Sequence, residues 1–249
     1  MAGSTHRVGE MMEVLTEYCD TPDIVTEDSD EEDDSTYLLR MEGVDIVTPK
    51  SDVPIIRNLN LTVEPSSNLL IMGPSGAGKT SIFRVISSLW PTISGSLKHI
   101  RERNILYFPQ QPYFSEGSLR EQVTQSVEPA DHTKDTDKIL SLLKMTNLSN
   151  LVERCGGLDM DPCWNWSQVL SPGETQRLVW TRLLYRKPRL ALLDEATSAI
   201  SEAQQELLYQ ACAENNITVV SIGHRESVRR FHNSLLLLDS TGAWRFITT

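Results

Sequence analysis

The sequence predicts an α/β fold built around a mostly parallel sheet. A short apolar run at residues 68–72 leads into a glycine-rich segment, and residues 81–86 then carry apolar side chains at helical spacing. Further short apolar runs are separated by helix-favouring stretches and lie at residues 104–108, 190–193, 218–222 and 234–238. Strands that alternate with helices in this way are typical of an open, mostly parallel sheet.

The remaining elements follow from turn residues and helical periodicity. Residues 37–72 read as strands, interrupted by turns at 48–52 and 64–66. Residues 115–167 look mainly helical, with irregular stretches around Pro129 and Gly156-Gly157, and residues 201–214 favour a helix. The last predicted strand is 234–238. The sequence has no internal repeat, so we expect a single α/β unit.

The negative charge of the chain belongs to its first residues. The 249 residues carry a formal net charge of −11, and residues 1–36 hold twelve acidic side chains against one arginine, Arg7, which accounts for all of it. The other residues balance to zero, so no clustered basic face indicates a nucleic-acid partner. No run approaches ~18 consecutive apolar residues, the length that spans a membrane.

The first 36 residues divide into two parts. Residues 4–18 place Val8, Met11, Met12, Leu15 and Tyr18 on one helical face. Residues 20–34 include an acidic run that cannot bury enough apolar surface to become ordered, and they read as a solvated linker. Core-like sequence begins near residue 37.

The glycine-rich segment matches the phosphate-binding pattern G-x-x-x-x-G-K-[ST] at every fixed position, as Gly73-Pro74-Ser75-Gly76-Ala77-Gly78-Lys79-Thr80. Its glycines let backbone N–H groups curl around an anion at the start of a helix. Lys79 would reach the outer phosphates, and the Thr80 hydroxyl would ligate Mg²⁺. A plain glycine turn is the alternative, but the strand before the loop and the helix after it favour a nucleoside triphosphate site.

Two acids end the apolar run at residues 190–193. A carboxylate at the carboxyl end of a strand beside the phosphate loop is suited to support Mg²⁺, which we assign to Asp194. Glu195 is then placed to polarise an attacking water. Two acids after a strand are also common in ordinary loops, so this pair is weak evidence alone.

A helix start is predicted at residues 170–174. Ser171 would be the N-cap, Pro172 the first helical residue, and Glu174 the partner of Ser171 in a capping box. The exposed N–H groups of such a terminus form a second anion site. Without further context, a plain helix cap is the simpler reading.

Two polar residues complete the set of candidates. Gln110 follows the predicted strand 104–108, and His224 lies just past the predicted strand 218–222. A lone glutamine or histidine at a strand end is usually an ordinary polar residue. Here, however, both stand in a fixed order with the phosphate loop, residues 170–174 and the acid pair.

That order of five motifs resembles the nucleotide-binding domain of ATP-binding cassette (ABC) transporters, over about residues 38–249. The resemblance implies a P-loop ATPase domain at residues 37–249, with an antiparallel β subdomain and a helical subdomain at about 112–182. Residues 88–91, 117–123 and 164–166 look like sub-family D, the peroxisomal and lysosomal half-transporters. The stretch 157–174 is most similar to the branch that moves cobalamin out of lysosomes.

The resemblance also implies cofactors and partners: ATP, Mg²⁺, a second such domain in a head-to-tail homodimer, and the membrane domain of a half-transporter. Residues 1–19 would be the cytosolic end of the last transmembrane helix, residues 20–36 the linker. The domain would lie on the cytosolic face of an organelle membrane. The lysosome is the expected organelle, and the endoplasmic reticulum and the peroxisome are the alternatives. The implied nucleotide-binding residues are Gly73, Pro74, Ser75, Gly76, Ala77, Gly78, Lys79, Thr80, Ser81, Gln110, Ser171, Gly173, Glu174 and Asp194.

Within that set the resemblance implies finer roles. Glu195, His224, Lys79 and Gln110 would act in catalysis, while Thr80, Gln110 and Asp194 would hold the metal.

Three residues depart from the family's pattern. Thr48 replaces an aromatic residue that stacks on adenine, Pro172 replaces a glycine and removes one backbone donor, and Ser201 replaces an aspartate. An ATP-dependent interaction module with negligible hydrolysis is therefore the first alternative. A soluble ABC ATPase of the DNA-repair or translation type is the second, but it needs a coiled-coil insertion or a second cassette, neither of which the sequence shows.

Overall fold

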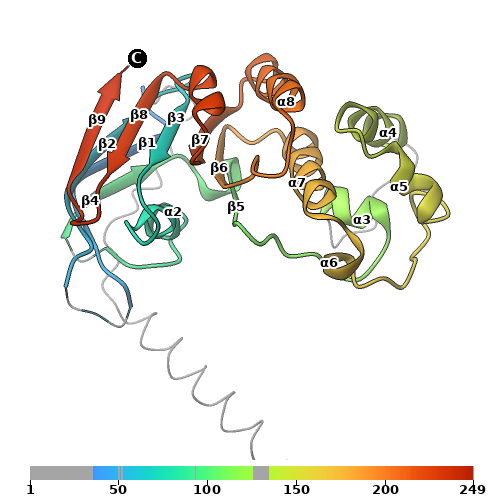
Figure 1. Cartoon of the computed structure of the whole chain (residues 1–249), viewed down its shortest axis with the longest axis horizontal. Helices are drawn as coiled ribbons and strands as arrows, with labels where there is room; N and C mark the ends of the chain where they lie inside the picture. Colours follow the sequence, from blue (N-terminus) through green and yellow to red (C-terminus); the bar gives the residue numbers. More distant parts are fainter. Residues whose placement is uncertain (1–35, 50, 52, 93, 126–134, 249) are drawn as a thin grey trace, which may run out of the picture.

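A computed structural model describes residues 36–49, 51, 53–92, 94–125 and 135–248 (Figure 1). The predictions for residues 1–19, for 20–35 and for the surroundings of Pro129 lie outside these residues. Within them, no helix is long and apolar enough to cross a membrane. The central feature is a six-stranded sheet in the order β5 (Ile105–Phe108), β6 (Leu190–Asp194), β7 (Thr218–Ile222), β3 (Leu69–Met72), β8 (Ser234–Leu238) and β9 (Trp244–Thr248).

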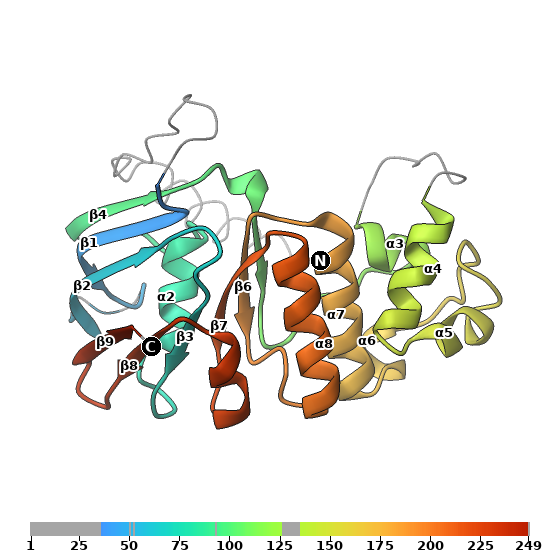
Figure 2. The same ribbon diagram turned by 90° about the horizontal axis from the view of Figure 1, so that it is seen from above.

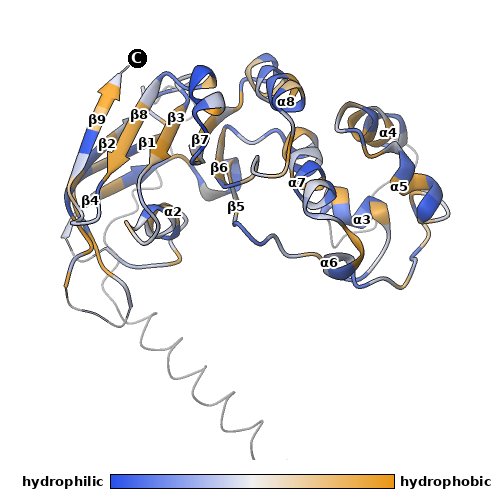
Figure 3. Ribbon diagram, in the orientation of Figure 1, coloured by the Kyte–Doolittle hydropathy of each residue, from blue (hydrophilic) through white to orange (hydrophobic). Residues whose placement is uncertain are grey.

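The sheet is parallel except at one edge, as predicted. β3 pairs in parallel with β7 and with β8, so that Ile71 lies opposite Ile222 on one side and Leu236 on the other. The central strands β3, β6 and β7 are buried on both faces, which explains why they read as continuous apolar runs. In Figure 3, β3 and β8 are accordingly among the most hydrophobic segments.

Two strands were missed by the sequence analysis. The expectation that residues 234–238 form the last strand is wrong, because β9 returns antiparallel to β8. The Asp239 carboxylate nucleates the connecting turn by accepting hydrogen bonds from the backbone N–H groups of Thr241 and Ala243, at 2.7 and 3.0 Å. The second missed strand, β4 (Ser94–His99), has one fully buried side chain, Leu97, and therefore shows little apolar patterning.

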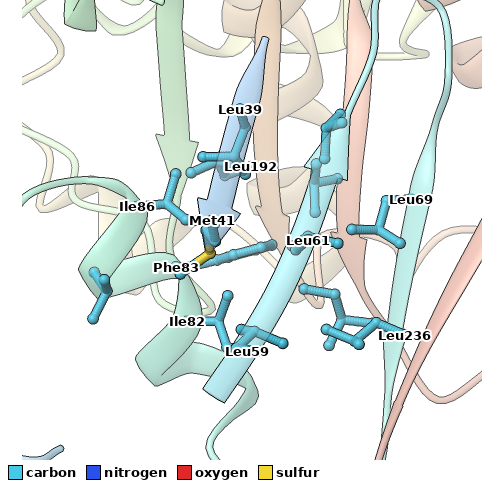
Figure 4. Packing of buried hydrophobic residues seen from close by; sticks show 14 of the residues in the cluster. Leu39, Met41, Leu59, Leu61, Leu69, Ile82, Phe83, Ile86, Leu192 and Leu236 are labelled. Atoms are coloured by element: carbon cyan, nitrogen blue, oxygen red, sulfur yellow. The ribbon is translucent and has the colours of Figure 1, made fainter. Parts of the chain in front are cut away.

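A second, antiparallel sheet lies against the first. It has the order β2 (Ile56–Val63), β1 (Leu39–Ile46) and β4. Helix α2 (Lys79–Ile86) packs between the two sheets, and Figure 4 shows its Ile82, Phe83 and Ile86 pointing into the apolar core formed with strands of both sheets. This core fixes the helix that begins at the phosphate-binding loop.

The other face of the main sheet is covered by two long helices, α7 (Pro172–Arg186) and α8 (Glu202–Glu214). Their apolar core includes Trp180 of α7, Leu208 of α8 and Ala191 of β6. A 3₁₀ segment, η2 (Glu226–Phe231), also contacts α8. α7 therefore lies directly against the strands that end at the candidate site.

The far end of the molecule is helical (Figure 2). A third apolar cluster joins α7 to the shorter helices, with Leu143, Trp166 and Leu178 among its members. The shorter helices are α3 (Leu119–Thr124), α4 (Thr136–Met145), α5 (Ser149–Arg154) and α6 (Trp166–Val169); a 3₁₀ turn, η1 (Glu102–Asn104), precedes β5. α7 contributes to both the second and the third clusters, so it connects the sheet to the helical end.

Candidate active site

The glycine loop between β3 and α2 has the geometry that the motif predicts. Gly76 and Gly78 have φ angles of +81° and +91°, a region that side chains disfavour. Gly73 is needed for a different reason, because a Cβ there would lie 2.6 Å from the backbone oxygen of Leu238. Gly78 is the residue before the first turn of α2, so the loop ends at a helix N-terminus.

Lys79 is held inside its own loop. Its Nζ donates hydrogen bonds to the backbone oxygens of Gly73 and Pro74, both at 2.8 Å, and the residue is only 7% exposed. Burial lowers the pKa of the ammonium group, while the nearby Glu195 and Asp194 carboxylates counteract that effect. The cation therefore stands at the phosphate-binding loop, bonded to groups that a phosphate oxygen could replace.

Thr80 and Asp194 form an oxygen pair at the end of β6. The Thr80 hydroxyl donates to Asp194 Oδ2 at 2.8 Å, and burial raises the pKa of this carboxyl group. Mg²⁺ is usually held by one or two carboxylates together with substrate phosphates, so this pair fits the ion only when a nucleotide supplies the other ligands. Consistently, the described residues contain no cluster of three or more acidic, histidine or cysteine ligands.

Glu195 is the meeting point of the remaining predicted residues. Gln110 Nε2 donates to Glu195 Oε2 at 2.9 Å, and His224 Nε2 lies 3.4 Å from Glu195 Oε1. The three residues follow β5, β6 and β7, whose carboxyl ends meet at one edge of the parallel sheet. Glu195 itself has φ +53°, an unusual conformation for a residue with a side chain, and its side chain is 28% exposed.

The predicted helix start at residues 171–174 is confirmed in detail. Ser171 is the N-cap of α7, Pro172 stands in the first turn, and the reciprocal Ser171–Glu174 capping box is complete. The Ser171 hydroxyl also donates to Glu174 Oε2 at 2.8 Å, and Arg154 of α5 pairs with Glu174 Oε1 at 2.6 Å. The hydrogen bonds from Ser171 and the charge of Arg154 outweigh burial and lower the pKa of Glu174.

The five motifs do not form one continuous site within the chain. Lys79, Thr80, Asp194, Glu195 and Gln110 gather at the sheet edge beside α2. The N-terminus of α7 adjoins α6, well apart from α2 in both views of the ribbon (Figures 1 and 2). The structure therefore assembles two separate groups of polar residues, one around the loop and one around Ser171.

One functional feature was missed by the sequence analysis. The segment from Glu195 to Ile200, which we call the Glu195 turn, is held by side chains from elsewhere in the fold, beginning with Gln176 and Trp180 of α7. Gln176 stands two residues after Glu174 and carries no pattern of its own. Only its place on the helix that crosses β6 gives it this role.

The three departures from the family pattern are all ordinary in structural terms. Ser201 is the N-cap of α8 and accepts a hydrogen bond from the Gln204 backbone N–H, so it has a local role that an aspartate could also fill. Pro172 lacks an N–H that the helix would not use there. Thr48 is partly buried, and its backbone oxygen accepts from the Ser51 N–H at 3.0 Å.

Comparison with known proteins identifies the family. The sequence profile of the ABC transporter family matches residues 56–198. The lysosomal cobalamin transporter ABCD4 of Mus musculus is 39% identical over 98% of this chain, and ATP-binding cassette sub-family D member 3 of Rattus norvegicus is 37% identical over 84%. The chain spans less than half of either protein, with 43% and 32% of their lengths covered.

A solved structure supports the fold assignment. A bacterial Atm1-family ABC exporter with ATP bound aligns with a TM-score of 0.69 and 22% identity, covering 82% of this chain and 37% of that one. Such low identity bears on the fold alone, which is the ABC ATPase fold predicted from the motifs. The resemblance to ABC transporters, including sub-family D, is thus confirmed, and the chain belongs to the ABC transporter family, whose ATPase domain it carries.

Proposed function

We propose that this domain binds ATP with Mg²⁺, dimerises head-to-tail with a second copy and hydrolyses the nucleotide to power a sub-family D half-transporter. The observation that carries the proposal is the cluster at the sheet edge, where Lys79, the Thr80–Asp194 pair and the Gln110–Glu195–His224 group converge around the glycine loop. These polar groups are suited to hold phosphates and to activate a water.

Each residue has a distinct part in the proposed reaction. Backbone N–H groups of residues 75–81 would hold the phosphates, and Lys79 would exchange its two carbonyl partners for phosphate oxygens. Glu195 would orient the attacking water and accept its proton, and His224 would contact the outer phosphate. Mg²⁺, when bound by Thr80, Asp194 and Gln110, would neutralise the charge on the phosphates.

The separation of the two polar groups supports the proposed dimer. Ser171, Gly173 and Glu174 stand at an exposed helix N-terminus, which attracts anions, yet they lie apart from the loop of the same chain. In a head-to-tail pair, each terminus would close over the nucleotide on the other copy. Phosphoryl transfer depends on positioning and charge neutralisation, so closure would act as the switch for hydrolysis.

For the whole transporter we propose cobalamin as the cargo, moved from the lysosome to the cytosol. The support is the 39% identity to relatives named lysosomal cobalamin transporters. We assign residues 37–249 to the nucleotide-binding domain, with the helical subdomain at about 112–182, residues 20–36 to a linker, and residues 1–19 to the cytosolic end of a membrane helix. The domain would face the cytosol, and its partner would be the membrane domain of the half-transporter.

The test is steady-state ATP hydrolysis by the purified chain across a protein-concentration series, beside Glu195→Gln. Removing a general base typically costs ~100-fold or more in rate, so we expect Glu195→Gln to lose nearly all turnover while keeping ATP binding. Turnover should rise faster than linearly with protein concentration if the site forms between two copies. The exposed Lys144→Ala variant of α4 serves as the control and should match wild type.

A second candidate is an ATP-dependent interaction module with negligible hydrolysis. Pro172 favours it, because it removes one backbone donor from the helix terminus that would meet the outer phosphate. The same experiment separates the two: ATP-induced dimerisation with turnover that Glu195→Gln does not change would support the module and overturn the ATPase proposal.

A further inference from the structure

The Glu195 turn is held by a ring of side chains that donate to its backbone oxygens. Trp180 Nε1 donates to the oxygen of Ala196 at 2.9 Å, and Gln205 Nε2 donates to those of Thr197 and Ile200 at 3.2 and 3.0 Å. Arg225, next to His224, donates to the oxygens of Ser198 and Ile200. Because so many side chains donate to this short turn, it has little freedom to move independently of the helices that supply them.

Gln176 makes the most complete set of these contacts. Its Nε2 donates to the backbone oxygen of Glu195 at 3.0 Å and to Ser198 Oγ at 2.6 Å, while its Oε1 accepts from the Ala199 N–H at 2.7 Å. Both ends of the turn are therefore tied to one amide group. Because the amide both donates and accepts, neither a carboxylate nor an apolar side chain can replace it fully.

Gln176 also lies one helical turn from the residues at the start of α7. Ser171 is the N-cap of this helix, and Gly173 stands so close to the turn that a Cβ there would lie 3.2 Å from the oxygen of Ala199. The strained φ of Glu195 can persist only while its surroundings hold it. A shift of the first turns of α7 would therefore act directly on the backbone of Glu195.

We propose that Gln176 is a positioning residue that transmits displacement of the α7 N-terminus to Glu195. In the dimer of the proposed function, on which this part rests, Ser171 meets the nucleotide of the other copy and Glu195 serves the chain's own nucleotide. Gln176 then connects the two ATP sites. Engagement of Ser171 by one nucleotide sets the position of Glu195 at the other.

Gln205 provides a matched comparison. It supports the same turn through its amide and is fully buried, but it comes from α8 and has no link to Ser171. Removing Gln205 should loosen the turn without disconnecting it from α7. Removing Gln176 should loosen the turn and also disconnect it from α7.

The test is hydrogen exchange at the backbone amides of the Glu195 turn in the nucleotide-free chain. Six proteins are compared: wild type, Ser171→Ala, Gln176→Ala, Gln205→Leu, and Ser171→Ala combined with each of the other two. Losing one hydrogen bond should raise exchange at the Ala199 amide ~2–10-fold in Gln176→Ala. Ser171→Ala removes the cap of α7 and should raise exchange across the turn by about 2–5-fold in wild type.

The combined variants decide the proposal. If Gln176 transmits the displacement, Ser171→Ala adds no further increase in the Gln176→Ala background but keeps its full effect beside Gln205→Leu. An effect of Ser171→Ala that survives without Gln176, or that is absent in wild type, overturns the proposal. These exchange measurements do not depend on ATP hydrolysis. A negative result would therefore contradict the role of Gln176 without contradicting the proposed ATPase function.

Gln176→Glu keeps the test decisive if Gln176→Ala does not fold. The glutamate retains an acceptor for the Ala199 N–H but faces the Glu195 oxygen with a second acceptor, so it should break transmission although its size is unchanged. Retention of the Ser171→Ala effect in Gln176→Glu would likewise contradict the proposal. Melting temperature and binding of Mg-ADP, measured on all variants, should confirm that each protein folds and that its loop is intact.

Discussion

The phosphate-loop group and the Ser171 group both lie at helix N-termini, where we propose that they bind anions, yet they are built differently. Around the loop, Lys79 and Asp194 are only 7% and 3% exposed, and Asp194 accepts a hydrogen bond from the Thr80 hydroxyl. At the start of α7, Ser171 is exposed, and its side chain bonds to Glu174, which in turn pairs with Arg154. The central charges of the first group are buried in the domain, whereas the second group is presented on its surface.

This difference teaches that the two groups contribute at different stages. Buried charges act strongly because water does not screen them, so we expect the loop to bind a nucleotide without the second copy. An exposed helix terminus binds anions weakly until another surface excludes water from it. We therefore expect loop variants to affect binding and Ser171 variants to affect closure.

The largest expected effect is that of Lys79→Ala. It removes the buried cation and its charge-assisted bonds to the phosphates, and should weaken ATP binding by ~100-fold or more. Titration of the chain with a fluorescent ATP analogue measures this, with Lys144→Ala as a control of equal charge change. Equal affinity in both variants would mean that the loop does not bind through Lys79.

Asp194→Asn should have opposite effects on binding and on stability. Binding of Mg-ATP should fall by about 10–100-fold, because a neutral amide oxygen holds Mg²⁺ more weakly than a charged carboxylate, while binding without Mg²⁺ should change little. Calorimetric titrations with and without Mg²⁺ separate the two. An equal loss in both would argue against a metal role for Asp194.

The same variant tests the pKa of Asp194. Burial raises that pKa in the folded state, so the native protein retains a proton that the unfolded chain loses near pH 3.8, and stability falls as pH rises through this window. Asp194→Asn avoids the buried charge. Its melting temperature should therefore exceed that of wild type at pH 7, and the advantage should disappear in acid.

Ser171→Ala should have a moderate effect on stability and on dimerisation, without a change in nucleotide binding at the loop. Loss of an N-cap costs about 1 kcal/mol, which for a domain of this size lowers the melting temperature by ~2–4 °C. ATP affinity at the loop should be unchanged, whereas ATP-dependent dimerisation, followed by analytical ultracentrifugation, should weaken. If monomeric Ser171→Ala bound ATP more weakly than wild type, the two groups would not have separate roles in binding and closure.

Pro172→Gly should have the smallest effect and sharpens the comparison. It restores a backbone donor at the start of α7, worth ~2–10-fold in turnover if that donor contacts the outer phosphate. The glycine also frees the backbone and should cost roughly 0.5–1 kcal/mol of stability. Unchanged turnover would mean that the terminus acts without that donor.

Most of the sheet and both helix N-termini of the candidate site could be predicted from the sequence. The central parallel strands are buried on both faces and so appear as apolar runs, and the Ser171–Glu174 spacing is itself the capping box. β4 and β9 escaped prediction because both lie at sheet edges, where half the side chains face solvent. An edge strand leaves little signal in hydropathy.

The contacts that join distant parts of the chain could not be predicted. Gln176 and Glu195 are 19 positions apart, and the amide of Gln176 meets that turn only because α7 crosses β6 in the folded domain. The positive φ of Glu195 and the bonds of Lys79 to its own loop are likewise products of three-dimensional packing. Motifs indicate which residues act, but not what holds them in position.

The bonds of Lys79 to Gly73 and Pro74 also have a consequence for selectivity. The backbone oxygens of Gly73 and Pro74 compete with any bound anion for the Lys79 ammonium group, since the anion must draw that group away from them. Inorganic phosphate or sulfate, abundant in cells, offers only a few contacts in exchange. A triphosphate chain would span the whole loop and bring its metal ion with it, so we expect the resting position of Lys79 to disfavour small anions relative to a nucleotide.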